Sequence, residues 1–191
     1  MLHSALLPGI DGTGRFFAPF MKCLPDGWRS KVVTYPTDVP LGYAELTDLA
    51  YAARPNSEKY LLVAESFSGP VVTNLAARHP RGLVGILIVC TFATTPPILR
   101  YAPAKLIAKF PFWKLPAQIT TSMLIGNDGS PPMRNLLHET LKEVTPALWR
   151  ARIEAVANLD VATELQSIDV PMLYIAASRK ARGWKSKDCR S

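Results

Sequence analysis

The stretch LLVAESFSGP, residues 61–70, decides the fold, because an apolar segment runs directly into small residues around one serine. A sharp turn from a strand into a helix can hold such a serine in a strained backbone conformation that projects its hydroxyl from the sheet edge. The residues two places before and after Ser66 must then be small, and they are Ala64 and Ser68, followed by Gly69. The pattern predicts a nucleophilic serine, although the same residues also suit an ordinary tight turn.

Apolar segments alternate with segments of helical spacing along the chain. The segment from Leu83 to Cys90 is apolar throughout, which is typical of a strand that is buried on both faces of a parallel sheet. Strands separated by helices indicate βαβ units. We therefore predict an α/β fold with a mostly parallel sheet wound with helices, with strands within residues 2–9, 30–36, 59–66, 82–92 and 170–178.

The pattern changes in the second half of the chain, where prolines and aromatic residues precede two long segments of helical spacing. We expect helices over residues 132–144 and 145–159, the second with Thr145 as its cap. This long segment without strands predicts a helical cap over about residues 94–160, inserted above the carboxyl edge of the sheet. The alternative is a set of ordinary connecting helices. Residues 1–178 are expected to form a single domain.

A glycine-rich loop, LPGIDGTG at residues 7–14, follows the first predicted strand. An acyl-transfer enzyme needs two N–H donors for the oxygen that becomes negatively charged during the reaction. One donor would come from Phe67, directly after the serine, and the other from Ile10 or Asp11, where glycines let the backbone approach a substrate. A dinucleotide-binding loop has a different glycine spacing, so we interpret this loop as part of an oxyanion hole.

Together, the LPGIDGTG loop and the AESFSGP segment, residues 64–70, resemble the α/β-hydrolase family, and small bacterial hydrolases in particular. The likeness extends from Leu6 to about Ser178. It implies the α/β-hydrolase fold and a serine hydrolase that cleaves carboxylic esters through an acyl-enzyme on Ser66, without a cofactor or a metal. The apolar cap favours small, uncharged esters as substrates. Glu65, before the serine, is expected to support the turn by hydrogen bonding.

The base and the acid that such a serine requires are missing from their usual places. In the family, an acid and then a histidine follow the strand that matches residues 172–178, but Lys180 stands at the acid's place and no histidine follows His138. We therefore expect a truncated or frameshifted C-terminus that leaves the triad incomplete. His138 is the candidate base because its helix can fold over the serine. The other histidines, His3 and His79, are expected far from the serine.

No aspartate has a context that identifies it as the catalytic acid, and the three candidates are Asp128, Asp160 and Asp188. Two consequences follow. First, the activity is expected to be weak, and the alternative function is a catalytically impaired, hydrolase-like binding domain. Second, without a further strand the sheet ends in an apolar edge, which can pair with a second copy and form a homodimer.

Charge and composition limit the other classes of function. The net charge is +7, but the last thirteen residues, 179–191, hold six basic residues and one acidic residue. We interpret them as a flexible basic tail and expect no nucleic-acid partner. No apolar run reaches the length that spans a membrane, so no membrane partner is expected. Three widely spaced cysteines suit neither a disulfide framework nor a metal site, which favours the cytoplasm.

Overall fold

The sheet is the centre of the molecule. The computed structural model describes residues 2–56, 59–100, 117–126 and 129–176. All strand pairs are parallel, and the order across the sheet is β2-β1-β3-β4-β5. This confirms the predicted mostly parallel sheet. The strands are β1 (Leu2–Leu7), β2 (Trp28–Val32), β3 (Tyr60–Glu65), β4 (Leu83–Val89) and β5 (Met172–Ile175).

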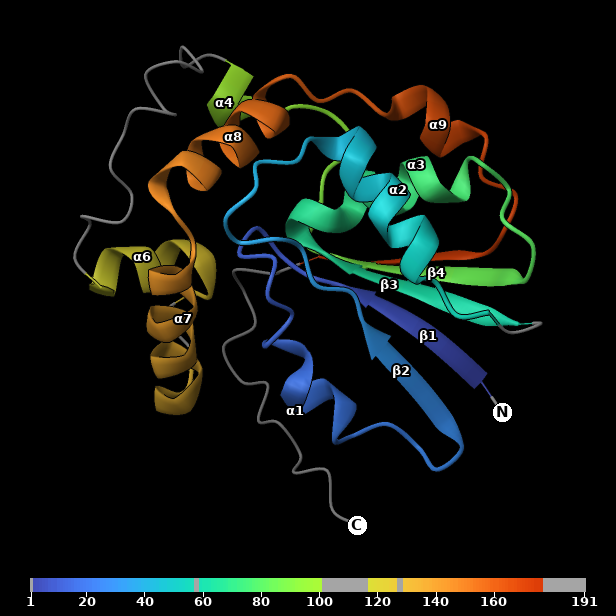
Figure 1. Cartoon of the computed structure of the whole chain (residues 1–191), viewed down its shortest axis with the longest axis horizontal. Coiled ribbons are helices and arrows are strands. Elements are labelled where there is room, and N and C mark those ends of the chain that lie inside the picture. The colour runs from blue at the N-terminus through green and yellow to red at the C-terminus, as the bar shows by residue number, and fades with distance from the viewer. Residues whose placement is uncertain (1, 57–58, 101–116, 127–128, 177–191) are drawn as a thin grey trace.

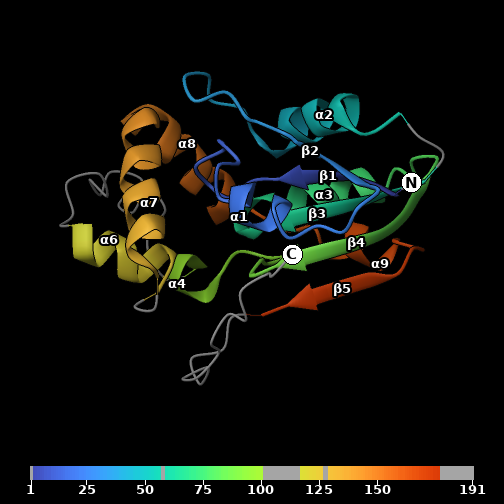
Figure 2. The same cartoon turned by 90° about the horizontal axis from the view of Figure 1, so that it is seen from below.

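Helices lie on both faces of the sheet and beyond one of its edges (Figure 1). Helices α2, α3 and α9 cover one face and α1 the other, while α4, α6, α7 and α8 gather beyond the carboxyl ends of the strands (Figure 2). The bounds are α1 (Phe17–Met21), α2 (Tyr43–Ala53), α3 (Gly69–Ala76), α4 (Pro97–Arg100), α6 (Ala117–Leu124), α7 (Pro131–Glu143), α8 (Pro146–Ala157) and α9 (Ala162–Gln166).

The two faces of the sheet have separate apolar cores. Alternate residues of β1, β3 and β4 pack with α2 and α3 in the larger core, which is why these two helices lie side by side. On the opposite face, Phe17 of α1 packs against Leu6 and Val63. Because both faces are covered, the central strands are apolar almost throughout, as the sequence predicts.

Strand β5 forms one edge of the sheet and is poorly covered. Leu173, Tyr174 and Ile175 are 61%, 52% and 45% exposed. The apolar edge expected from the sequence is therefore present, and its pairing with a second copy stays a prediction. The tail at residues 179–191 lies outside the described residues.

The region expected to form a cap is helical where it is described. Helix α8 begins as predicted, because the side chain of Thr145 accepts a hydrogen bond of 3.2 Å from the N–H of Leu148. Residues 101–116 of this region lie outside the described residues. The region's placement beyond the carboxyl ends of the strands is compatible with a cap, which stays a prediction.

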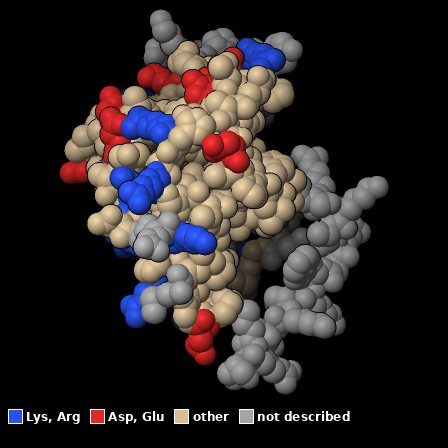
Figure 3. Space-filling view, turned by 90° about the vertical axis from the view of Figure 1, so that its right-hand side faces the viewer, with Lys and Arg blue, Asp and Glu red and all other residues tan. Residues whose placement is uncertain are grey.

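Charged side chains of both signs occur together on the surface. On the face at which the strands begin, basic and acidic side chains alternate among uncharged ones (Figure 3). Of the helices in the described part of the chain, none combines the length and the apolar character needed to cross a membrane.

Candidate active site

Ser66 stands directly after β3, at the carboxyl edge of the sheet. Its φ is +48°, in the left-handed region that residues other than glycine rarely adopt. The side chain is half-buried, so packing does not seal it from solvent. The strained turn predicted from the sequence is present, whereas the role of Ser66 as a nucleophile stays a prediction.

Thr91, which follows β4, holds the turn in place. Its hydroxyl donates a hydrogen bond of 2.5 Å to the backbone carbonyl of Ser66. The backbone N–H of Gly69 donates to the same carbonyl. A Cβ on Gly69 would lie 1.8 Å from the Thr91 hydroxyl oxygen, so the turn and this threonine fit together only with glycine at that position.

The glycine-rich loop after β1 folds on itself and leaves two N–H groups unused. Gly12 donates its N–H to the Gly9 carbonyl at 3.1 Å, and the Asp11 carboxylate accepts from the N–H and the hydroxyl of Thr13 at 2.8 and 2.5 Å. Within the described residues, the N–H groups of Ile10 and Asp11 have no hydrogen-bond acceptor. The sequence offers either Ile10 or Asp11 as the second donor of the oxyanion hole, and in the loop the N–H groups of both residues are available.

The loop and the serine turn lie side by side because β1 and β3 are paired neighbours, with Leu7 opposite Ala64. The hydroxyl of Ser68 donates to the backbone carbonyl of Pro8, and it lies 2.6 Å from the hydroxyl of Tyr35. Ser68 is fully buried, so these contacts fix the loop against the turn. The structure therefore brings together the predicted turn residues and the predicted oxyanion loop.

Two carboxyl groups lie close together here, that of Asp11 within the loop and that of Glu65 beside it. The Glu65 side chain lies beside Gly9, where an added Cβ would be 3.8 Å from its carboxyl carbon. Its carboxyl group makes no hydrogen bond to another described residue, so the hydrogen bonding expected from Glu65 to the turn is not found there. Burial raises the pKa of Glu65, and the negative charge of Asp11 raises it further. A carboxyl with a raised pKa more readily stays protonated and neutral at this position.

Arg152 of α8 is a member of the site that the sequence analysis did not identify. It is 1% exposed, and it donates hydrogen bonds to the backbone carbonyls of Ile10 and Pro36. Burial lowers the pKa of its guanidinium, an effect that the nearby Asp11 partly offsets. The available signal was its position in the helix, because it lies among the buried residues Leu148, Trp149, Ile153 and Val156 at helical spacing.

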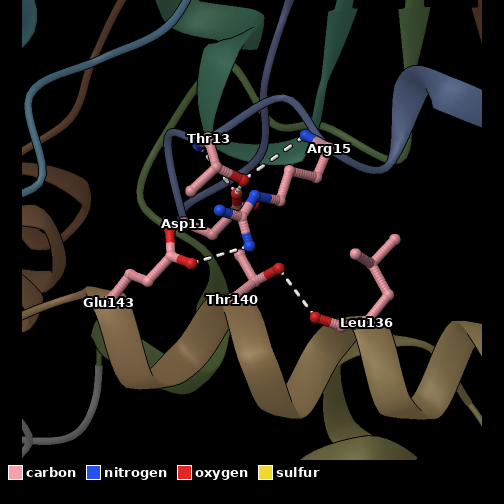
Figure 4. A network of polar contacts seen from close by, with 6 residues as sticks. All are labelled: Asp11, Thr13, Arg15, Leu136, Thr140 and Glu143. Carbon is pink, nitrogen blue, oxygen red and sulfur yellow. Dashed lines mark hydrogen bonds and ion pairs between the residues drawn. The ribbon is translucent and has the colours of Figure 1, made fainter.

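Helix α7 also contacts the loop, as Figure 4 shows. The guanidinium of Arg15 and the carboxylate of Glu143 are 2.6 Å apart, and both side chains are about half exposed. Next to them, the Thr140 hydroxyl donates to the carbonyl of Leu136 within α7. An exposed ion pair of this kind contributes little stability, so it orients α7 rather than anchoring it.

None of the three histidines contacts Ser66 in the described part of the chain. His3 lies in β1 opposite Tyr60, at the end of the sheet remote from the serine. His79 lies beyond α3, where its Nδ1 is 3.4 Å from the Asp169 carboxylate. The Nε2 of His138 is 3.4 Å from the Thr121 hydroxyl of α6, and its role as a base stays a prediction.

Asp160, one of the candidate acids, is exposed and accepts a hydrogen bond of 3.1 Å from the N–H of Ala162 at the start of α9. This contact supports a structural role at the helix start. Asp128, Asp188 and Lys180 lie outside the described residues.

Solved structures with a similar fold are found at low sequence identity. An enol-lactonase from Burkholderia xenovorans LB400 has a TM-score of 0.75 and 18% identity, covering 91% of this chain and 72% of that chain. A structure described under carboxylesterases of the Thaumarchaeon Nitrososphaera gargenis has a TM-score of 0.72 and 14% identity, with coverages of 93% and 72%. An alpha/beta hydrolase enzyme from a Medee basin deep-sea metagenome library has a TM-score of 0.58 and 15% identity, with coverages of 90% and 70%.

No family model and no curated protein sequence matches this chain. The structural likeness, together with the parallel sheet and the strained serine turn after β3, defines the fold. The chain has the α/β-hydrolase fold.

Proposed function

We propose that this protein is a serine hydrolase that cleaves small carboxylic esters through an acyl-enzyme on Ser66. The observation that carries the proposal is the left-handed backbone of Ser66 at the end of β3, beside a loop with unused N–H groups. Such strain costs on the order of 1–3 kcal/mol and persists where the surrounding structure enforces it, as in nucleophile turns. Several solved structures with this fold are described as hydrolases or under carboxylesterases.

The chemistry proceeds in two acyl transfers. The Ser66 oxygen forms a bond to the ester carbonyl carbon, its proton passes to a base, and the carbonyl electron pair moves to the oxygen. The N–H of Phe67 and that of Ile10 or Asp11 bind this oxyanion. Its collapse breaks the bond to the alcohol, which leaves with the proton. Water then attacks the acyl-serine by the same route, which releases the acid and restores Ser66.

The substrate class follows from the surroundings of the serine. Phe67 is 1% exposed and its ring stacks on Tyr43, with 4.9 Å between the ring centroids. The carboxyl groups of Asp11 and Glu65 lie on the loop side. An anionic substrate would meet the negative charge of Asp11, so uncharged esters are the better fit.

A binding domain with little turnover is the second candidate. The observation that favours it is the placement of His138 against Thr121, together with the other histidines at the far end of the sheet. Without a base, an oxyanion hole and substrate binding alone sustain roughly 10³-fold acceleration over water. Turnover of activated esters would then be slow but would still depend on Ser66.

A fluorophosphonate probe followed by intact-mass analysis tests the proposal without a choice of substrate. We expect one probe molecule on the wild-type chain, located on Ser66, and none on Ser66→Ala. Ser68→Ala is a poor control because Ser68 is buried, so Ser122→Ala, an exposed serine of α6, serves as the matched control. Equal labelling of the wild type and Ser66→Ala would contradict the proposal.

Hydrolysis of p-nitrophenyl acetate then separates the two candidates. Turnover that depends on Ser66 and continues after the first equivalent of product supports the hydrolase. A single stoichiometric burst without turnover supports the binding domain with an acylated serine. Identical rates for the wild type and Ser66→Ala would exclude the serine from either reaction.

A further inference from the structure

Arg152 is an arginine buried where a helix would normally place an apolar side chain. Removing a guanidinium from water is costly unless hydrogen bonds and nearby negative groups compensate. Here two backbone carbonyls accept from the guanidinium, and Asp11 interacts favourably with its charge. The Nε atom has no hydrogen-bond partner among the described residues, so the compensation is incomplete. An apolar side chain would fill this position at less cost.

The carbonyl that Arg152 holds determines where one candidate donor points. The Ile10 carbonyl and the Asp11 N–H belong to one planar peptide unit, and in a trans peptide they point in opposite directions. The described residues contain no cis peptide bond. When Nη1 of Arg152 binds the Ile10 carbonyl, the Asp11 N–H therefore points away from the guanidinium.

The same guanidinium also contacts Phe67, the candidate donor that follows the serine. Its central carbon lies 5.9 Å from the centroid of the Phe67 ring, within the range of a cation–π contact. Gly12 makes room for it, because a Cβ there would lie 2.7 Å from Nη2 and 3.0 Å from Nη1. Arg152 thus touches both the oxyanion loop and the residue after the serine.

We infer that Arg152 is a positioning residue, which fixes the Ile10–Asp11 peptide and thereby the part of the loop that supplies the second donor of the oxyanion hole beside Phe67. The inference rests on the proposed function. It explains why a residue of α8, 142 positions along the chain from Ile10, reaches the loop after β1.

The test compares Arg152→Met, which keeps the apolar stem, with Arg152→Lys, which keeps the charge but not the forked geometry. Arg150→Met is the matched control, because Arg150 is exposed on the same helix. Misplacing one oxyanion donor reduces the rate by about 10²–10³-fold. We expect that loss in the rate of fluorophosphonate labelling and in kcat for p-nitrophenyl acetate, with KM little changed.

A trifluoromethyl ketone inhibitor adds a measurement that loss of packing alone would not reproduce. Its tetrahedral adduct places an oxyanion in the hole, so its affinity should fall by the same factor as kcat. Folded Arg152 variants that label as fast as Arg150→Met would overturn the inference, as would a loss confined to KM. If Arg152→Met does not fold, Arg152→Lys decides.

The outcomes also separate this inference from the proposed function. Labelling that persists in Ser66→Ala overturns the proposed function and the inference with it. Labelling that requires Ser66 but is unaffected in the folded Arg152 variants overturns the inference alone.

Discussion

The hydroxyl of Thr91 donates a hydrogen bond of 2.5 Å to the backbone carbonyl of Ser66, and this contact joins the ends of two neighbouring strands. The Ser66 carbonyl shares a peptide unit with the Phe67 N–H, so holding the carbonyl also fixes the direction of that N–H. Thr91 therefore fixes the direction of the Phe67 N–H in the same way as Arg152 fixes that of the Asp11 N–H, by donating a hydrogen bond to the carbonyl of the same peptide unit. The N–H groups of Phe67 and Asp11 thus each belong to a peptide unit whose carbonyl accepts a hydrogen bond from a side chain.

Replacement of Thr91 by valine tests this relation, because valine keeps the shape against Gly69 and removes only the hydrogen bond. We expect the labelling rate of Ser66 to fall about tenfold and the free energy of unfolding to fall by about 1 kcal/mol. Thr91→Ser, which keeps the hydroxyl, should restore most of the rate. Valine and serine variants that react equally would show that the hydroxyl plays no part.

Gly69→Ala should disrupt the turn from the other side. The added Cβ would lie 1.8 Å from the Thr91 hydroxyl oxygen, and the φ of Gly69 is −56°, so the effect is steric rather than conformational. We expect a loss of about 1–3 kcal/mol in the free energy of unfolding, together with slower labelling. The double variant Gly69→Ala with Thr91→Gly, which removes the obstructing side chain, should recover part of the stability. Thermal denaturation measures the change.

The parallel sheet and the serine turn were predictable because their signals are local. The uninterrupted apolar run at β4 and the small residues around Ser66 report burial and backbone geometry directly. Boundaries that depend on distant partners were less predictable. Strand β2 was expected within residues 30–36 but covers Trp28–Val32, because the chain then bends toward the loop, where the N–H of Tyr35 donates to the Gly12 carbonyl.

Arg152 illustrates what local patterns cannot reveal. Its neighbours predict a buried helix face correctly, but its partners, the Ile10 and Pro36 carbonyls, lie more than a hundred residues away in sequence. For Arg152, tertiary contacts rather than spacing therefore decide the outcome.

Glu65 predicts a pH dependence of stability. Because its pKa in the folded protein is raised above the usual value of 4.5, folding favours the protonated form. Its stabilising contribution is therefore complete below that value and is lost as the pH rises through the raised pKa. Glutamine resembles the protonated carboxyl, so Glu65→Gln should gain stability relative to the wild type as the pH rises from 4.5 upward.

Urea denaturation of both proteins across this pH range measures the difference in the free energy of unfolding. Glu154→Gln, an exposed change on α8, controls for the loss of one negative charge. A difference between the wild type and Glu65→Gln that is independent of pH, or that grows as the pH falls, would contradict the prediction.

In the described part of the chain β5 is an edge strand of the sheet, which predicts self-association into a homodimer. The Pro171 and Ile175 carbonyls accept hydrogen bonds from β4, so in a parallel pair the N–H and carbonyl of Tyr174 point outward, where a second β5 can pair with them. Tyr174→Pro removes the outward N–H without touching the bonds to β4. We expect light scattering over a range of concentrations to show a dimer for the wild type and a monomer for this variant.

Tyr174→Ala loses the same side chain but keeps the N–H, so it should still dimerise. A wild-type protein that stays monomeric at every concentration, or a proline variant that dimerises as well as the alanine variant, would rule out pairing through this edge.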